Sequence, residues 1–307
     1  MGDIATRVAY GEALAEFGAD TNIVVLDADL SKSTQTCKFK EKYPERFINC
    51  GIAEGNMMSV AAGLAASGKT VFASSFAMFA AGRAFEQIRN SICYPNLNVK
   101  IGATHAGISV GEDGATHQSI EDIALMRVIP NMTVISPVDA IETRLAIKAA
   151  IEHNGPVYLR LGRLGVPTVN SEDYKFELGK GVQLREGNDI AIIATGLMVG
   201  EALKAADILK SEGINARVIN IHTIKPIDVD IITKAASETR GIVTAEEHSI
   251  IGGLGGAVAE VLATSHPAKL AMVGVEDKFG RSGKPADLLK YYGLTAERIV
   301  EKCKSIF

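Results

Sequence analysis

The sequence contains no tryptophan, only four cysteines and no excess of charge of either sign. Cys37, Cys50, Cys93 and Cys303 lack the Cys-x-x-Cys spacing of a zinc site, so we expect reduced structural thiols and no metal cluster on this chain. The formal charge is -4, and no basic stripe interleaved with aromatic residues is present. This composition argues against a nucleic acid as a partner.

Long hydrophobic runs and an apolar amino-terminal leader are also missing. The apolar runs are short, as in residues 190–194, whereas a membrane span needs ~20 residues. Residues 1–4 contain neither a basic segment nor an apolar signal core. We therefore expect a cytoplasmic protein that does not bind membranes.

Short apolar runs alternate with helical patterns along 307 residues, a length that predicts two domains at ~100–200 residues each. Residues 23–26 form a continuous apolar run, which is typical of a strand buried on both faces of a parallel sheet. The first unit has expected strands near Phe47 and at 69–73, 99–103, 134 and 157–161, with helices at 6–17, 57–66, 77–92 and 140–151.

The apolar periodicity is lost between residues 165 and 187, where Pro167, Asn170, Asp173 and several glycines gather. We expect a first domain at 1–165, a linker at 166–187 and a second domain at 188–307. In the second domain the expected strands are 190–194, 216–221, 241–245 and 270–275, with helices at 200–211, 229–236 and 254–263. The predicted fold class is α/β, with two domains that each contain a mainly parallel sheet flanked by helices.

Two polar turns at strand ends indicate one ligand site. Glu54 lies between an apolar strand and a helical pattern, where a carboxylate by itself could simply complement the helix dipole. Residues 104–118, rich in glycine, histidine and acids, follow another strand. Because ligands of open α/β sheets bind at the carboxyl ends of the strands, the two turns together predict a binding site. The glycines of 252–256 lack the spacing of a phosphate loop, so we interpret them as close helix packing beside residues 246–248.

These motifs resemble the transketolase family of thiamine-diphosphate enzymes. Residues 51–54, Gly-Ile-Ala-Glu, are similar to the segment whose glutamate contacts the aminopyrimidine of the cofactor. Residues 111–118, Gly-Glu-Asp-Gly-Ala-Thr-His-Gln, are similar to the family's Gly-Glu-Asp-Gly-Pro-Thr-His-Gln loop. The resemblance covers the whole chain but only the carboxy-terminal half of a transketolase, which consists of a pyrimidine-binding domain and the transketolase C-terminal domain.

The resemblance implies cofactor roles for four residues. Thiamine diphosphate reacts only when N1' of its pyrimidine is protonated, and a hydrogen-bonded carboxyl group in a dry pocket, here Glu54, provides for this. Phe76 and Phe79 would pack on the pyrimidine face, and Asp29 matches a further cofactor-binding position. A third aromatic residue of that pocket in many transketolases corresponds to Gly82 here, which is a departure from the family pattern.

The resemblance also implies substrate contacts. Asp113 would hydrogen-bond a sugar hydroxyl, and His117 would assist proton transfer or polarise the reacting carbonyl. Four residues match positions that hold the sugar phosphate, and arginine suits this role because its planar fork binds phosphate oxygens in pairs: Arg7, Ser33, His105 and Arg163. Taken singly, Arg7 also fits a solvated helix charge and His105 a structural hydrogen bond. No motif surrounds His153, His222 or His266, and we assign them no function.

The family's Gly-Asp-Gly motif, which binds diphosphate and Mg2+ on an amino-terminal domain, is not found in the sequence; residues 187–189 have the wrong order. The resemblance therefore implies one subunit of a split transketolase of the pentose phosphate pathway. It would transfer a two-carbon ketol unit between sugar phosphates, share thiamine diphosphate with a separate N-terminal subunit that binds Mg2+, and form a homodimer within a heterotetramer.

Three alternatives stay open at this stage. A split 1-deoxyxylulose-5-phosphate synthase has the same loop but carries arginine where His105 stands. The beta subunit of a 2-oxoacid dehydrogenase has a similar size, but the 112–118 loop argues against it. A non-catalytic paralogue that acts as a binding partner would have no reason to keep Glu54, Asp113 and His117.

Overall fold

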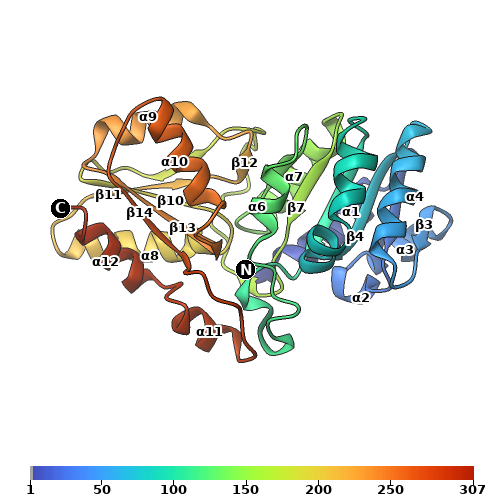
Figure 1. Ribbon diagram of the computed structural model, residues 1–307, viewed down its shortest axis with the longest axis horizontal. Coiled ribbons are helices and arrows are strands. Elements are labelled where there is room, and N and C mark those ends of the chain that lie inside the picture. The colour runs from blue at the N-terminus through green and yellow to red at the C-terminus, as the bar shows by residue number, and fades with distance from the viewer. Residues whose placement is uncertain (1–2) are drawn as a thin grey trace.

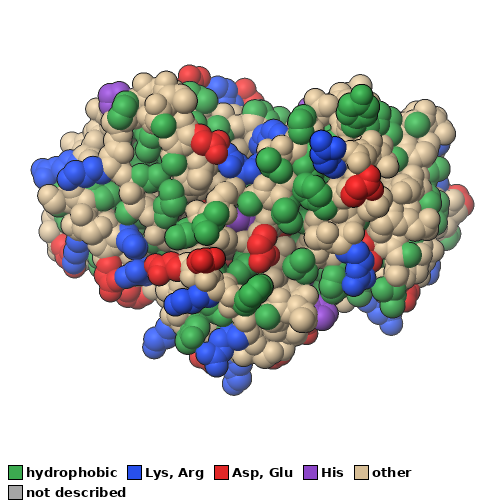
Figure 2. Space-filling model, in the orientation of Figure 1, with side chains coloured by type: hydrophobic (Ala, Val, Ile, Leu, Met, Phe, Trp, Pro, Cys, Tyr) green, Lys and Arg blue, Asp and Glu red, His purple; other side chains and the backbone are tan. Residues whose placement is uncertain are grey.

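The computed structural model describes residues 3–307 and shows two α/β lobes side by side (Figure 1). The first lobe runs from blue to green, and the second from yellow to red. Acidic, basic and hydrophobic side chains are interspersed over the face in Figure 2, in keeping with the small net charge. No helix within residues 3–307 combines the length and apolar character needed to cross a membrane.

A seven-stranded sheet forms the first lobe, in the order β12-β6-β7-β5-β4-β2-β3. Six of its strands are parallel, and β12 is antiparallel to β6. The strands are β2 (Ile23–Asp27), β3 (Phe47–Asn49), β4 (Thr70–Phe76), β5 (Val99–Thr104), β6 (Thr133–Ile135), β7 (Val157–Arg160) and β12 (Thr223–Lys225). All five residues of β2 are buried, which confirms the strand predicted from its apolar run.

Helices cover both faces of this sheet because successive side chains of a strand point to opposite faces. Phe72 of β4 packs with residues of α1 and α7, whereas its neighbours Val71 and Ala73 pack against α4. The helices are α1 (Thr6–Phe17), α2 (Ser31–Thr34), α3 (Cys37–Lys42), α4 (Glu54–Ala66), α5 (Phe85–Gln87), α6 (Asp122–Arg127) and α7 (Ala140–Glu152), with a short 3-10 turn at Pro44–Arg46.

The second lobe contains a five-stranded sheet in the order β14-β13-β10-β11-β9. Its strands are β9 (Val182–Arg185), β10 (Ile190–Ala194), β11 (Ala216–Asn220), β13 (Ile242–Ser249) and β14 (Leu270–Val275), and only β9 is antiparallel. One face carries α8 (Met198–Ser211) and α12 (Ala296–Lys304), and the other carries α9 (Val229–Glu238) and α10 (Leu254–Thr264). The short helix α11 (Pro285–Tyr291) extends toward the first lobe (Figure 1). The predicted α/β fold with two mainly parallel sheets is therefore confirmed.

Several elements differ from the sequence prediction, each for a local reason. The single helix expected at 77–92 is wrong: wide π-helical turns, Met78–Arg83 and Ile88–Cys93, flank the short α5. Helix α4 begins at Glu54 rather than Met57, because Gly55 and Asn56 carry no apolar signal. Strand β13 extends to Ser249, four residues beyond the predicted end. The prediction stopped early because the last residues of the strand are polar, although they are largely buried, and so they interrupt the apolar run.

Two short strands were not predicted in the stretch that includes the proposed linker. β8 (Gly165–Val166) pairs with β1 (Ile4–Ala5), and β9 lies within residues 166–187. Strand β9 lies at the edge of the sheet, and all four of its residues are half-buried. Polar residues are tolerated at such positions, so the strand has no continuous apolar run by which it could be predicted.

Candidate functional site

Glu54 is a buried carboxylate in the first turn of α4, where it is 1% exposed. Arg83 donates a hydrogen bond to Glu54 Oε2 at 3.0 Å. Among residues 3–307 no hydrogen bond is made to the other carboxylate oxygen, Oε1. One oxygen is thus held by a guanidinium, and the other is available to a ligand.

An aromatic wall lies beside this carboxylate. The rings of Phe76, at the end of β4, and Phe79, in the following π-helical turn, are stacked with centroids 6.0 Å apart and planes at 14°. Arg83 lies 5.0 Å over the Phe79 ring, so one guanidinium joins the aromatic wall to Glu54. Sequence reasoning missed Arg83, although its i,i+4 spacing from Phe79 could have indicated the contact.

Both histidines of the 104–118 segment pack on the aromatic wall. His105 is stacked on Phe76 with ring centroids 3.9 Å apart, and His117 meets Phe79 edge-on at 5.2 Å. His105 follows β5 in a left-handed conformation, with φ 56°, which is uncommon for a residue with a side chain. The turn after β5 therefore aims its imidazole at the end of β4.

Two arginines, Arg7 and Arg163, lie near enough to His105 to affect its charge state. The pKa of His105 is lowered to about 3, chiefly by burial and in smaller part by the charges of Arg7, Arg163 and His117. The pKa of Arg7 is likewise lowered by burial and by Arg163. His105 is thus neutral at neutral pH and can offer an N–H donor between two cationic side chains.

Ser33 and Asp113 complete this group from two other segments. Arg7 Nη1 donates to the backbone carbonyl of Ser33 at 2.6 Å, not to its hydroxyl. Arg163 Nη1 lies 3.7 Å from Asp113 Oδ2 and donates to the carbonyl of Val110. The structure therefore brings Arg7, Ser33, His105, Asp113 and Arg163 together, as the resemblance implies.

Asp29 and Gly82 are the two remaining positions that the resemblance singled out, and neither contacts the group around His105 through an interaction described above. Asp29 is exposed, and within the described residues its carboxylate accepts only from Asn49 Nδ2, at 2.8 Å. This bond ties the turn after β2 to the end of β3. A Cβ on Gly82 would lie 2.5 Å from the Met78 methyl group, so methionine occupies the space beside this glycine. Sequence reasoning missed Met78.

The glycines at 252–256 have a structural role, as we interpreted from their spacing. Both oxygens of Glu246 accept from the first turn of α10, Oε2 from Leu254 N at 2.7 Å and Oε1 from Gly255 N at 2.8 Å. A Cβ on Gly253 would lie 2.0 Å from Glu246 Oε2. A protein carboxylate thus already fills this helix N-terminus. Within residues 3–307 no group of three or more His, Cys, Asp or Glu side chains is arranged to hold a metal ion.

Two family models match the chain in succession: "Transketolase, pyrimidine binding domain" over residues 2–168 and "Transketolase, C-terminal domain" over residues 179–299. The chain belongs to the transketolase family. This confirms the resemblance, and membership implies dependence on thiamine diphosphate and a transferase activity.

Transketolase sections of similar length are among the relatives. "Putative transketolase C-terminal section" of Methanocaldococcus jannaschii is 57% identical over 96% of this chain and 94% of its own length. "6-deoxy-6-sulfo-D-fructose transketolase subunit SqwH" of Clostridium sp. (strain MSTE9) is 45% identical over 98% of this chain and 94% of its own length. The solved structure named "Split gene transketolase, inactive beta4 tetramer" is 56% identical, with a TM-score of 0.91 over 99% of this chain and 98% of that chain.

Proposed function

We propose that this chain is the C-terminal subunit of a split transketolase, which transfers a two-carbon ketol unit from a ketose phosphate to an aldose phosphate. One observation carries the proposal: His105 is stacked 3.9 Å from Phe76 and lies within the field of Arg7 and Arg163. A single imidazole thus joins the aromatic wall, suited to a cofactor ring, to a cationic group suited to a sugar phosphate.

The residues fit the pyrimidine half of thiamine diphosphate. Phe76 and Phe79 offer an apolar stacked surface, and beside it Glu54 Oε1 accepts no hydrogen bond from the described part of the chain. Met78 fills the space next to Gly82, so the wall is closed by a thioether where many family members have an aromatic ring. When bound, the cofactor supplies the nucleophilic carbon that accepts the two-carbon unit.

Each side chain then has a distinct task. Glu54 holds a proton at N1' of the pyrimidine, while Arg83 fixes its other oxygen. Asp113 accepts a hydrogen bond from a sugar hydroxyl, and His117, half-buried against Phe79, moves a proton at the reacting carbonyl. The remaining residues bind the phosphate group, which arginine contacts in pairs of hydrogen bonds: Arg7, Ser33, His105 and Arg163.

A separate diphosphate-binding subunit with its Mg2+ would complete the enzyme, with this chain present as a dimer in a heterotetramer. Two observations support the need for a separate subunit. First, the family models that match this chain are those of the pyrimidine-binding and C-terminal domains. Second, the Methanocaldococcus jannaschii relative is named a C-terminal section of transketolase, and the solved structure of similar length is named a split gene transketolase.

The test is reconstitution. We expect no ketol transfer by the purified chain with thiamine diphosphate and Mg2+, and activity after a diphosphate-domain subunit is added. Titration calorimetry of the lone chain should show weak binding that does not depend on Mg2+. Tight Mg2+-dependent binding, or full activity without a partner, would show that the second subunit is not needed.

A sulfonated sugar is a second candidate substrate, favoured by the name of the Clostridium relative. The pair Arg7 and Arg163 can bind a sulfonate by the same charge and hydrogen bonds as a phosphate. Assaying the reconstituted enzyme with phosphorylated, sulfonated and neutral sugars in parallel distinguishes the two substrates.

A further inference from the structure

The segment that carries Asp113 and His117, here named the Asp113 loop (residues 105–119), has little regular structure of its own. It contains a short 3-10 turn, Ile108–Asp113, and Gly107, Gly111 and Gly114 have positive φ angles of 85°, 87° and 79°. Asp113 is exposed, whereas Gly111, Gly114 and Gln118 are buried. Such a loop holds a fixed shape only if other parts of the molecule support its buried side.

Glu247, from β13 of the second lobe, provides one support. Its Oε1 accepts a hydrogen bond from the backbone N–H of Ser109 at 2.5 Å. A Cβ on Gly107 would lie 2.4 Å from Glu247 Cδ, so the loop makes room for this carboxylate. Both residues of the bond are buried, and the bond crosses from one lobe to the other.

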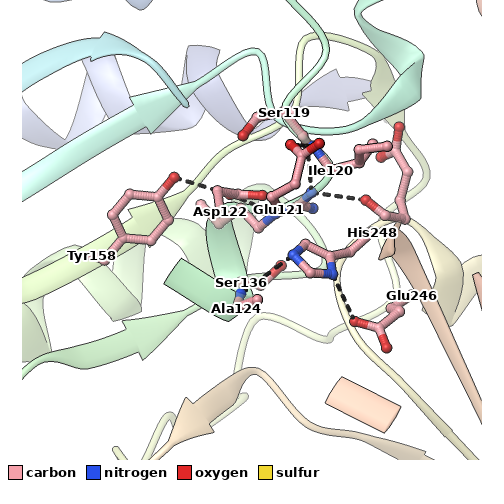
Figure 3. A network of polar contacts seen from close by, with 12 residues as sticks. Ser119, Ile120, Glu121, Asp122, Ala124, Ser136, Tyr158, Glu246 and His248 are labelled. Carbon is pink, nitrogen blue, oxygen red and sulfur yellow. Dashed lines mark hydrogen bonds and ion pairs between the residues drawn. The ribbon is translucent and has the colours of Figure 1, made fainter. Parts of the chain in front are cut away.

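A buried polar network fixes the strand that carries Glu247 (Figure 3). Arg160 donates to the Glu247 carbonyl at 2.8 Å and to Asp122 Oδ2 at 2.9 Å, and the Tyr158 hydroxyl donates to the same oxygen at 2.9 Å. Figure 3 shows Asp122 and Tyr158 facing the strand of Glu246 and His248. The position of Glu247 relative to the first lobe is therefore set by groups that have no freedom to reorient in solvent.

The second support is the Gly280 loop, defined as residues 279–285. Gln118 Nε2 donates to the carbonyl of Arg281 at 2.9 Å and also to two carbonyls of its own loop, Ile108 at 3.2 Å and Gly111 at 3.3 Å. A Cβ on Gly280 would lie 1.8 Å from Gln118 Oε1. Gln118 therefore occupies the space that any side chain at position 280 would need.

The two loops interlock at further glycines of the Asp113 loop. A Cβ on Gly114 would lie 2.4 Å from Ser282 Oγ, and one on Gly111 would lie 3.0 Å from Pro285 Cγ. The Tyr292 hydroxyl donates to the Phe279 carbonyl at 2.7 Å and so holds the Gly280 loop against α11.

We propose that the second lobe holds the Asp113 loop in its working shape, and that Gln118, Gly280 and Glu247 are positioning residues. Their catalytic consequence rests on the proposed function, in which Asp113 and His117 act on the sugar. The C-terminal domain thus contributes to ketol transfer through the shape of the Asp113 loop.

Hydrogen exchange of the full-length chain tests the support independently of activity. Gly280→Ala should raise amide exchange in residues 108–118 about ten-fold, because the added methyl group displaces Gln118. The matched control is Gly200→Ala in α8, where the nearest atom to the new Cβ is 3.9 Å away. Tyr292→Phe is a milder variant, to be used if Gly280→Ala fails to fold. It should also raise amide exchange in residues 108–118, because it removes the hydrogen bond to the Phe279 carbonyl.

Kinetics of the reconstituted enzyme test the catalytic consequence. Gly280→Ala should lower kcat/KM by about ten- to hundred-fold, since small misplacements of acting groups have effects of this size. The Kd for thiamine diphosphate should change little, because Glu54, Phe76 and Phe79 lie on other elements. The double variant Gly280→Ala with Gln118→Ala should have a kcat/KM no lower than that of Gln118→Ala alone. The reason is that both changes remove the same contact, between Gln118 and the Gly280 loop.

Unchanged exchange in residues 108–118 for both Gly280→Ala and Tyr292→Phe would overturn the proposed support. Raised exchange with unchanged kcat/KM, or losses that multiply in the double variant, would overturn its catalytic role. If the reconstituted wild type transfers no ketol unit, the proposed function fails, while the exchange comparison still decides whether the second lobe holds the loop.

Discussion

Glu54 is almost fully buried, but among residues 3–307 only one of its oxygens is held by a protein group, Arg83. Burial without a second partner costs free energy, so the position is stable chiefly because the guanidinium compensates the charge. Replacing Glu54 by glutamine keeps the shape of the side chain but removes the proton exchange with the pyrimidine that we propose for this residue.

We expect Glu54→Gln in the reconstituted enzyme to lower turnover by about two or more orders of magnitude, because an amide cannot share a proton with N1'. Thermal unfolding should shift by only a few degrees. Turnover close to that of the wild type, measured side by side, would exclude this role for Glu54.

Arg163→Ala should raise the KM for phosphorylated acceptors about ten-fold, as expected for the loss of a charged hydrogen bond of ~1.5–3 kcal/mol. Unphosphorylated short aldoses should be nearly unaffected. His105→Ala should show the same selectivity with a smaller effect, because its ring is neutral, and Asp113→Ala should impair both classes. Equal losses on both classes for Arg163→Ala would mean that the arginine supports its loop through Val110 instead.

Glu142 is the residue with the clearest expected pH effect. Burial raises its pKa to about 7, although Val138 N, Tyr174 and Asn220 donate to its carboxylate. Between pH 4.5 and 7 Glu142 keeps its proton in the folded chain but has lost it in the unfolded chain. The free energy of unfolding therefore falls as the pH rises through this range. The total decrease from this group is about 3 kcal/mol.

Urea unfolding at pH 5, 6 and 7.5 checks this effect. Glu142→Gln should remove that part of the pH slope, whatever constant offset the amide introduces. Glu152→Gln changes an exposed glutamate at the end of the same helix and should keep the slope of the wild type. Parallel curves for Glu142→Gln and the wild type would contradict the raised pKa.

At the level of elements, α10 depends on a carboxylate from the neighbouring strand, because Glu246 accepts from its first-turn N–H groups. Gly253→Ala should displace this carboxylate and destabilise the protein by about 1–3 kcal/mol, the cost of leaving buried polar groups unpaired. Gly256→Ala in the same helix meets no atom closer than 3.8 Å and should have little effect. Denaturant unfolding compares the two, and equal stabilities would refute the capping role.

The elements that could be predicted from sequence were those with a strong local signal. The apolar run of β2 and the pattern of α1 predicted both correctly. The helix predicted at 140–151 is also present as α7, which begins where Asp139 accepts a hydrogen bond from Glu142 N. The π-helical turns at Met78–Arg83 and Ile88–Cys93 could not be predicted, because a wide turn and an α-helix share the same apolar residues. The contact of Glu247 with Ser109, 138 residues apart, carries no local signal at all.

The site shows the same limit. The motif residues Glu54, Asp113 and His117 were recognisable in the sequence, whereas Arg83 was missed and no role was predicted for Met78 or for Gln118, the last residue of the loop motif. The role of each of these three residues depends on the groups that folding brings next to it. Examples are the Phe79 ring beside Arg83 and the backbone carbonyl of Arg281 beside Gln118.

At the scale of the whole molecule, the two lobes share strands as well as side-chain contacts. β12 follows the second lobe's β11 in sequence but pairs with β6 at the edge of the first lobe's sheet. Lys225 of β12 also donates to the carbonyls of Arg127 and Ile129 in the first lobe. The lobes are therefore joined through the backbone of a sheet, which resists sliding better than a side-chain interface.

This shared strand has a consequence for how the protein is made. A ribosome adds ~5–20 residues per second from the amino terminus, so β12 emerges several seconds after β6, about 90 residues earlier in the chain. During that interval the edge of β6 has no neighbour and can pair with another nascent chain. The amino-terminal lobe, although synthesised first, is completed only when the carboxy-terminal lobe returns a strand to it.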